Sequence, residues 1–105
     1  MNAMQREPVT PQPSATLSEL RDAFEHNRIL IDRFGLSEGM DDETADALHA
    51  SLLYDPVNRL LGTEPKSIDD CAAILSALHF QLEGAGSDLE ANAVNAILNF
   101  IDHHA

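Results

Sequence analysis

The chain of 105 residues has little cysteine, little basic charge and no long apolar run, and each shortage excludes a class of protein. Its single cysteine, Cys71, cannot form an intramolecular disulfide, so a packed core has to hold the fold. The longest uninterrupted apolar run, 71–75, has five residues, whereas about twenty are needed to span a bilayer. Residues 1–30 contain no apolar stretch of the length that a secretory signal requires. The sequence therefore predicts a cytoplasmic protein that does not enter a membrane.

Basic residues are scarce as well. Six lysines and arginines stand against 18 aspartates and glutamates, which gives a formal net charge of −12. A charge of this sign and size opposes contact with phosphates, so we expect no direct binding to nucleic acid. Residues 1–40 hold 6 acidic and 4 basic side chains, whereas residues 41–105 hold 12 and 2. The acidic surface either keeps the protein in solution or faces a basic partner.

The motifs of the common enzyme and metal-protein classes are absent. The chain has no Gly-x-Ser-x-Gly turn and no glycine-rich loop followed by the lysine that a phosphate site needs. No histidine has a second histidine three or four residues away, which is the spacing that puts two metal ligands on one helix face. We therefore expect no catalytic residues, no metal site and no cofactor. The histidines are His26, His49, His79, His103 and His104.

Helix signals dominate what the sequence does contain. Four residues or pairs of the capping type each precede a run of apolar residues spaced three and four apart. No alternating run of β-branched residues indicates a strand. The sequence predicts an all-α protein, a small four-helix bundle over residues 16–105, preceded by a disordered proline-rich tail over residues 1–15. The four expected starts are Thr16, Asp41 or Asp42, Ser67 and Ser87.

The first predicted helix carries a polar residue in its apolar row. Thr16 and Glu19 fit a capping box, and Gly35 supplies a left-handed stop. Asn27 fills the one position in the row that is not apolar. A buried amide in such a row is costly unless paired, and it can fix register or partner number, with Asn95 as a possible companion. Alternatively, the helix is exposed at that height. The apolar members of the row are Leu17, Leu20, Phe24, Ile31 and Phe34.

The second predicted helix meets a proline. It carries Ala45, Leu48, Leu52 and Leu53 before the pair Asp55-Pro56. Because proline has no amide hydrogen and crowds the preceding turn, the helix either kinks or restarts there. We favour a restart, with Asp55 as the cap of a short second piece. That piece bears Val57, Leu60 and Leu61 and ends at Gly62.

The third and fourth predicted helices are separated by Gly84-Ala85-Gly86. Ser67 with Asp70 begins the third helix, and Cys71 lies in its apolar row as a core thiol. Ser87 with Glu90 begins the fourth helix. The third helix has the row Ile68, Cys71, Leu75, Leu78 and Leu82, and the fourth has Leu89, Ala93, Ala96, Ile97 and Phe100.

The fourth helix has a second apolar row beside the first, which leaves only a narrow polar strip. A surface helix normally shows a broad charged face, so a second molecule is expected to cover this one. The alternative is that the N-terminal tail or the second helix covers it. The predicted homodimer interface consists of Ala91, Val94, Leu98, Ile101, Asn27 and Asn95.

These observations favour a non-catalytic helical module for protein–protein interaction, whose partner is a second copy bound through the C-terminal helix. The alternative is an acidic inhibitor that occupies the basic groove of a nucleic-acid-binding protein. That alternative requires one contiguous exposed array of carboxylates spaced like phosphates. The array would consist of Asp41, Asp42, Glu43, Asp46, Asp69 and Asp70.

Overall fold

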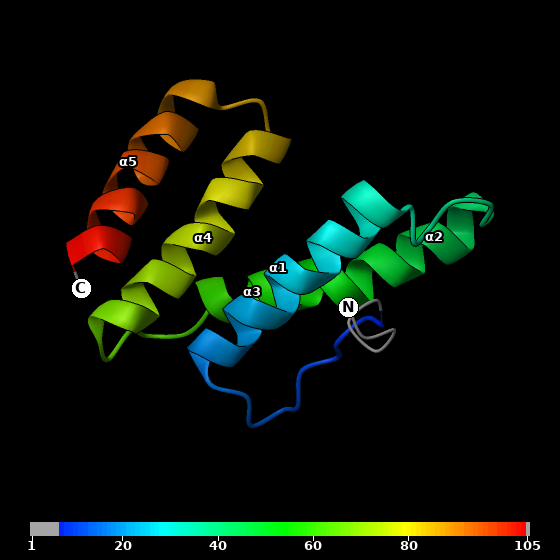
Figure 1. The fold of residues 1–105 in the computed structure, drawn as a ribbon, viewed down its shortest axis with the longest axis horizontal. Helices are drawn as coiled ribbons and strands as arrows, with labels where there is room; N and C mark the ends of the chain where they lie inside the picture. The colour runs from blue at the N-terminus through cyan, green and yellow to red at the C-terminus, as the bar shows by residue number, and fades with distance from the viewer. Residues whose placement is uncertain (1–6, 105) are drawn as a thin grey trace.

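The computed structural model describes residues 7–104, without the side chain of residue 104, and this part of the chain is helical with no strand. Figure 1 shows the helices, coloured by their order along the chain. Three of the segments join end to end as one long helix, so the predicted all-α architecture of four helices is confirmed. The segments are α1 (Leu17–Phe34), α2 (Asp42–His49), a π-helical segment (Ala50–Tyr54), α3 (Asp55–Leu61), α4 (Ile68–Gly84) and α5 (Asp88–His104).

The helix ends follow the local signals of the sequence. Thr16 Oγ1 accepts from the amide of Glu19 at 3.1 Å, and Glu19 Oε1 accepts from the amide of Thr16 at 2.9 Å. The bond from the backbone of Thr16, and then the one from its side chain, lower the pKa of Glu19. Gly35 ends α1 with φ of 63°, a conformation that favours glycine. Ser67 Oγ accepts from the amide of Asp70 at 3.0 Å and caps α4.

The predicted restart at Asp55 is wrong. Asp55 has φ −63° and ψ −51°, so it lies inside a continuous helix instead of capping a new one. The chain accommodates Pro56 by widening the preceding turn, where the amide of Asp55 donates to Ala50 O, five residues back. Pro56 has no N–H for the carbonyl of Leu52 four residues earlier. Asn27 Nδ2 donates to that carbonyl instead, at 3.1 Å.

The core lies where α1, α3 and α4 meet. Phe24 of α1 is 1% exposed, and its ring meets that of Phe80 edge to face, with centroids 4.9 Å apart. The Arg28 guanidinium lies 5.4 Å from the centre of the Phe80 ring, so the aromatic cluster is partly covered by a cation. The buried cluster comprises Leu17, Leu20, Phe24, Leu53, Val57, Leu60, Ala73 and Ala77.

Helix α4 packs through small residues, which differs from the predicted row. Ile68 at its start is 59% exposed, and Cys71 is only half-buried, so the prediction that Cys71 is a core thiol is wrong in degree. Small side chains let neighbouring helices approach α4 closely from more than one side. Figure 1 shows α1 and α3 on one side of α4 and α5 on the other. The fully covered residues of α4 are Ala72, Ala73, Ser76 and Ala77.

The N-terminal segment, residues 7–15, contains no helix or strand but is bound to the helices, whereas the sequence predicted a disordered tail here. Val9 exchanges two hydrogen bonds with the side chain of Asn27, each of 2.8 Å. Arg59 Nη2 donates to Gln12 O at 2.7 Å. Residues 1–6 of the predicted tail lie outside the described part of the chain. Residues 7–15 therefore belong to the folded structure, because polar groups of α1 and α3 hold their backbone.

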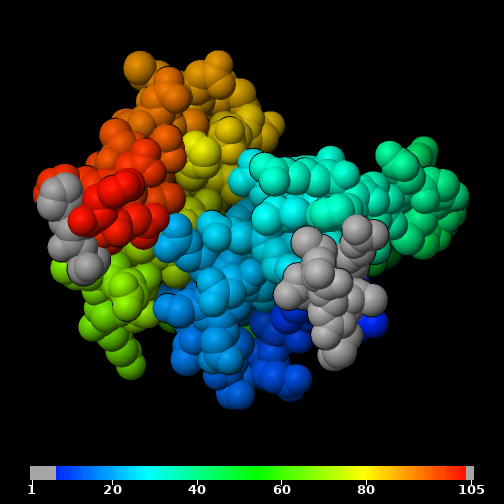
Figure 2. Space-filling model, in the orientation of Figure 1, coloured from blue at the N-terminus to red at the C-terminus, as the bar shows by residue number. Residues whose placement is uncertain are grey.

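Helix α2 projects from the rest of the molecule. None of its residues is buried, and its main neighbour is the π segment that continues it. In the space-filling view of Figure 2 it forms one extremity, while α5, in orange and red, lies near the other. The long helix therefore contributes to the core only through its second half, from Leu52 onward.

Candidate functional site

Helix α5 packs against the body of the protein along one face. Ala91 is 3% exposed and Leu98 is 8% exposed. Val94 and Ile101 are half-buried. The element that covers this face is α4, which lies beside α5 along the pair (Figure 1). These four residues belong to the intramolecular packing of α5.

The first apolar row of the predicted fourth helix faces solvent in α5. Leu89 is 81% exposed, Ile97 is 53% exposed and Phe100 is 63% exposed. Ala93 and Ala96 lie between them and are exposed as well. We call these five residues the outer row of α5. It is an apolar surface that runs along most of a 17-residue helix.

The interface predicted from sequence is therefore on the wrong face. Ala91 and Leu98 are covered by the chain itself, and Val94 and Ile101 are partly covered. The exposed outer row is the row that the sequence analysis assigned to the core. Both rows have helical spacing and similar hydrophobicity, so the sequence contained no local signal that distinguishes the inner from the outer face.

The two asparagines of the predicted interface do not meet. Asn95 is exposed on α5, whereas Asn27 is fully buried in α1. Each polar atom of the Asn27 side chain has an intramolecular partner, since Oδ1 accepts from Val9 N and Nδ2 donates to Val9 O and Leu52 O. Asn27 thus fixes contacts within one chain, and both of the roles expected for it, at an interface or exposed to water, are wrong.

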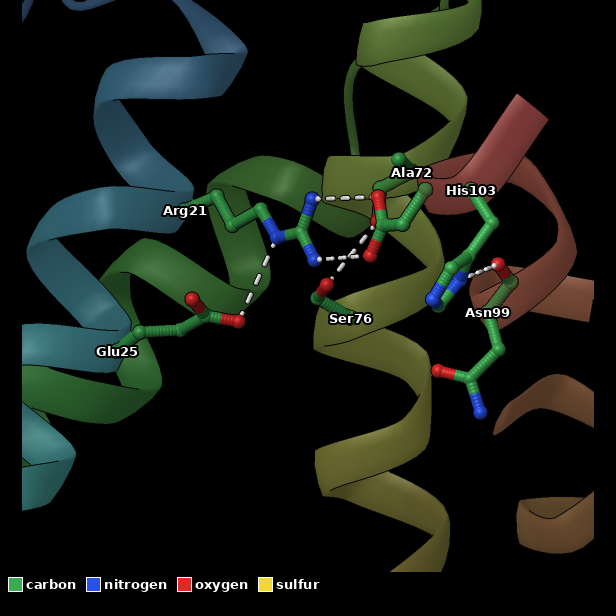
Figure 3. Close-up of polar contacts among 7 residues, drawn as sticks. Arg21, Glu25, Ala72, Ser76, Asn99 and His103 are labelled. Atoms are coloured by element: carbon green, nitrogen blue, oxygen red, sulfur yellow. Dashed lines mark hydrogen bonds and ion pairs between the residues drawn. The ribbon is translucent and has the colours of Figure 1, made fainter. Parts of the chain in front are cut away.

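An ion pair connects α5 to α1. Arg21 donates to both carboxylate oxygens of Asp102, with distances of 3.4 Å and 3.1 Å, and contacts Glu25 at 3.4 Å. Partial burial on its own lowers the pKa of Arg21, but the hydrogen bond to Asp102 and the neighbouring carboxylates raise it on balance. Figure 3 shows Arg21 extending from α1 toward α4 and α5, with Glu25 beside it. This partly exposed ion pair links the end of α5 to α1.

The acidic array required by the inhibitor hypothesis is divided. Asp41, Asp42, Glu43 and Asp46 lie at the start of α2, at one extremity of the molecule. Asp69 and Asp70 lie in the first turn of α4, toward the opposite end in the view of Figure 1. The prediction of one contiguous array is therefore wrong. The carboxylates of each group lie in a first helical turn or close to one, where the helix dipole favours negative charge.

The described part of the chain offers no cluster of metal ligands. Among the described side chains, those of residues 7–103, no three of His, Cys, Asp or Glu are placed so that they could hold an ion. His79 lies 3.3 Å from Glu83 along α4, and His49 lies 3.2 Å from Ser37. A cavity of about 630 Å³ forms an open hollow between the N-terminal segment, the start of α1 and the loop after α3.

Comparisons with known proteins add no relatives. Neither the protein-family models nor the curated proteins nor the solved structures gave a match to this chain. Among the helices in residues 7–104, none combines the length and the apolar character needed to cross a bilayer. The exposed outer row of α5 is therefore the feature from which we argue function.

Proposed function

We propose that the protein is a non-catalytic interaction module that forms a homodimer through the outer row of α5. The observation that carries the proposal is the exposure of Leu89, Ile97 and Phe100 on one face of one helix. Contiguous apolar surface of this kind marks interaction sites in proteins that keep an otherwise polar surface. The remainder of the described surface of α5 carries Asp88, Glu90 and Asp102.

The pattern of large and small residues fits a second copy of the same helix. In an antiparallel pair centred between Ala93 and Ala96, these two small residues face each other, and Leu89 of one copy faces Phe100 of the second. Small residues at the centre allow the helix axes to approach, and large residues at both ends fill the space where they diverge. The same patch serves both copies, as two-fold symmetry requires.

The free energy gained by burying the outer row in a dimer can be compared with the cost of association. The exposed fractions of Leu89, Ile97 and Phe100 together correspond to about two fully exposed side chains per copy. Full burial of one such side chain is worth about 1.5–3 kcal/mol, so two copies gain roughly 6–12 kcal/mol. Association costs about 4–15 kcal/mol in lost freedom of motion. The gain and the cost are of similar size, and at the favourable end of both ranges the net gain of about 8 kcal/mol corresponds to a dissociation constant of about 1 μM, so any dimer is reversible.

The test is sedimentation velocity across a concentration series, with Ile97→Asp and a matched control. Ile97 and Ile68 are similarly exposed, at 53% and 59%, but Ile68 lies in α4 and is not part of the outer row. We expect the wild type and Ile68→Asp to approach twice 11.5 kDa at about 100 μM. Ile97→Asp should stay at 11.5 kDa, because dimerisation would bury its charge.

Salt separates self-association from capture of a basic partner. Two copies that each carry a net charge of −12 repel one another, so raising the salt concentration should strengthen the homodimer. A complex with a basic partner would weaken under the same change. A wild type that stays monomeric at about 100 μM in both low and high salt would refute the proposed function.

A further inference from the structure

Polar side chains of α1 and α3 form hydrogen bonds with the backbone of the N-terminal segment, residues 7–15. Asn27 Oδ1 accepts from Val9 N and Asn27 Nδ2 donates to Val9 O, both at 2.8 Å. His26 Nε2 lies 2.8 Å from Glu7 O. Arg59 Nη2 donates to the carbonyls of Gln12 and Pro13, at 2.7 Å and 3.2 Å. The helices thus contact the backbone of the segment at Glu7, Val9, Gln12 and Pro13, and the segment then forms a turn in which the amide of Ala15 donates to Gln12 O at 3.0 Å.

These contacts depend little on which side chains the segment carries. Each of the bonds reaches a main-chain atom, and the Val9 side chain remains 44% exposed. An asparagine that pairs with both the N–H and the C=O of one residue acts as a neighbouring strand would. Such a contact accepts any extended residue other than proline at that position. The same groups would therefore bind another extended chain.

Prolines suit the remaining positions. Among the described bonds between the segment and the helices, Val9 N is the one donor that the segment provides, and the other segment atoms are carbonyl oxygens. Pro8, Pro11 and Pro13 therefore lose no bond through their missing amide hydrogens. Proline-rich chains are already extended before they bind, so little entropy is lost when they are held.

A cavity lies beside the segment, and a peptide with a larger side chain could fill it. The open cavity of about 630 Å³ is bordered by Pro13 and Ala15 of the chain itself, and by Leu17, Leu20, Arg59 and Lys66. Its lining is mixed: it includes two of the six basic residues of the protein and also the acidic residues Glu64 and Asp70. Ser14, the residue between the two bordering residues of the segment, is exposed and small. A larger side chain near that position could enter the cavity.

We propose that Asn27, His26 and Arg59 form a binding groove for an extended, proline-containing peptide of another protein, and that residues 7–15 occupy it as an intramolecular competitor. A second copy is a poor source of the peptide. The tethered segment has an effective concentration of about millimolar, so an identical segment at micromolar concentration cannot displace it. A different peptide that also fills the cavity can. The groove lies apart from the outer row of α5, so this proposal does not depend on the dimer.

The first arm of the test loosens the tethered segment in the full chain. Val9→Pro removes the N–H that Asn27 accepts and leaves the helices unchanged. A fluorescein-labelled peptide with the sequence of residues 7–15 is titrated with each protein, and polarisation is recorded. Because one hydrogen bond of the competitor is lost, we expect Val9→Pro to bind the peptide at least about fivefold more tightly than the wild type does. Thr10→Ala, which removes no described bond, should bind like the wild type.

The second arm tests recognition of the backbone itself. Two peptides carry an N-methyl group, one at the nitrogen of Val9 and one at the nitrogen of Thr10. The Val9 peptide should lose at least about fivefold in affinity for the Val9→Pro protein, since its N–H is the one that Asn27 accepts. The Thr10 peptide should bind like the unmodified one. Titration is also followed through the Asn27 side-chain amide signals in nitrogen-15 NMR spectra, which should shift on binding.

Three results would overturn the proposal. The first is equal affinity of the wild type and Val9→Pro for the labelled peptide. The second is no binding by Val9→Pro at about 1 mM peptide, which is weaker than any useful site. The third is an equal loss of affinity for the two N-methyl peptides, which would mean that the backbone of Val9 is not recognised. Circular dichroism of each variant verifies that the helices are intact, so that a lost site is not confused with a lost fold.

Discussion

The replacement of Asn27 by alanine tests the central packing claim most directly. Asn27 is fully buried and makes three hydrogen bonds, two to Val9 and one to Leu52 O. Alanine removes the Asn27 donor from Leu52 O, and Pro56 supplies none in its place. A buried carbonyl without a partner costs about 1–3 kcal/mol, and releasing Val9 costs roughly a further 1 kcal/mol. We expect Asn27→Ala to lower the free energy of unfolding by about 2–4 kcal/mol.

A second substitution isolates the carbonyl of Leu52. Pro56→Ala introduces a backbone N–H four residues after Leu52, which can serve Leu52 O when Asn27 is absent. The cost of Asn27→Ala should therefore fall by about 1–2 kcal/mol in the Pro56→Ala background. Urea unfolding followed by circular dichroism at 222 nm measures all four proteins of this cycle. If the cost of Asn27→Ala is the same in both backgrounds within about 0.5 kcal/mol, Asn27 does not compensate for the proline.

Two further predictions concern α5 and the start of α1. Leu98→Ala should lower the free energy of unfolding by about 2–5 kcal/mol, because Leu98 is buried. Ile97→Ala should lower it by less than about 0.5 kcal/mol when the monomer is measured, because Ile97 faces water. Similar costs for the two substitutions would show that the two faces of α5 are assigned wrongly. The lowered pKa of Glu19 means that its contribution to stability is present above the pKa of the unfolded chain and lost as the pH falls through the lowered value. The urea midpoints of the wild type and Glu19→Gln should therefore converge between about pH 6 and pH 3, and a constant difference would contradict the reasoning.

The features that the sequence predicted well are local. Thr16, Ser67 and Gly35 act on the backbone within a few residues of themselves, so their effect does not depend on the rest of the fold. Four helices in the predicted order followed from these signals. Their boundaries agree with the prediction to within about two residues, except that no boundary forms at Asp55.

The features that the sequence did not predict depend on contacts between distant segments. Which row of α5 faces inward depends on its packing against α4, whose buried residues are small, and the spacing of apolar residues in α5 does not reveal that packing. The role of Asn27 required knowing that Leu52 O lies beside it, 25 residues along the chain. A signal for this existed in Pro56, since a proline inside a helix leaves one carbonyl in need of a donor. Nothing in the sequence pointed from Pro56 to Asn27.

The lack of any buried residue in α2 makes this arm a suitable place to alter the protein deliberately. A fluorophore, an affinity tag or a short inserted loop between Gly39 and Ala47 would meet water on nearly every side. It would also lie far from the outer row of α5, at the opposite extremity of the molecule. The molecule thus provides its own attachment point for a reporter, at an end where added mass leaves its folded body undisturbed.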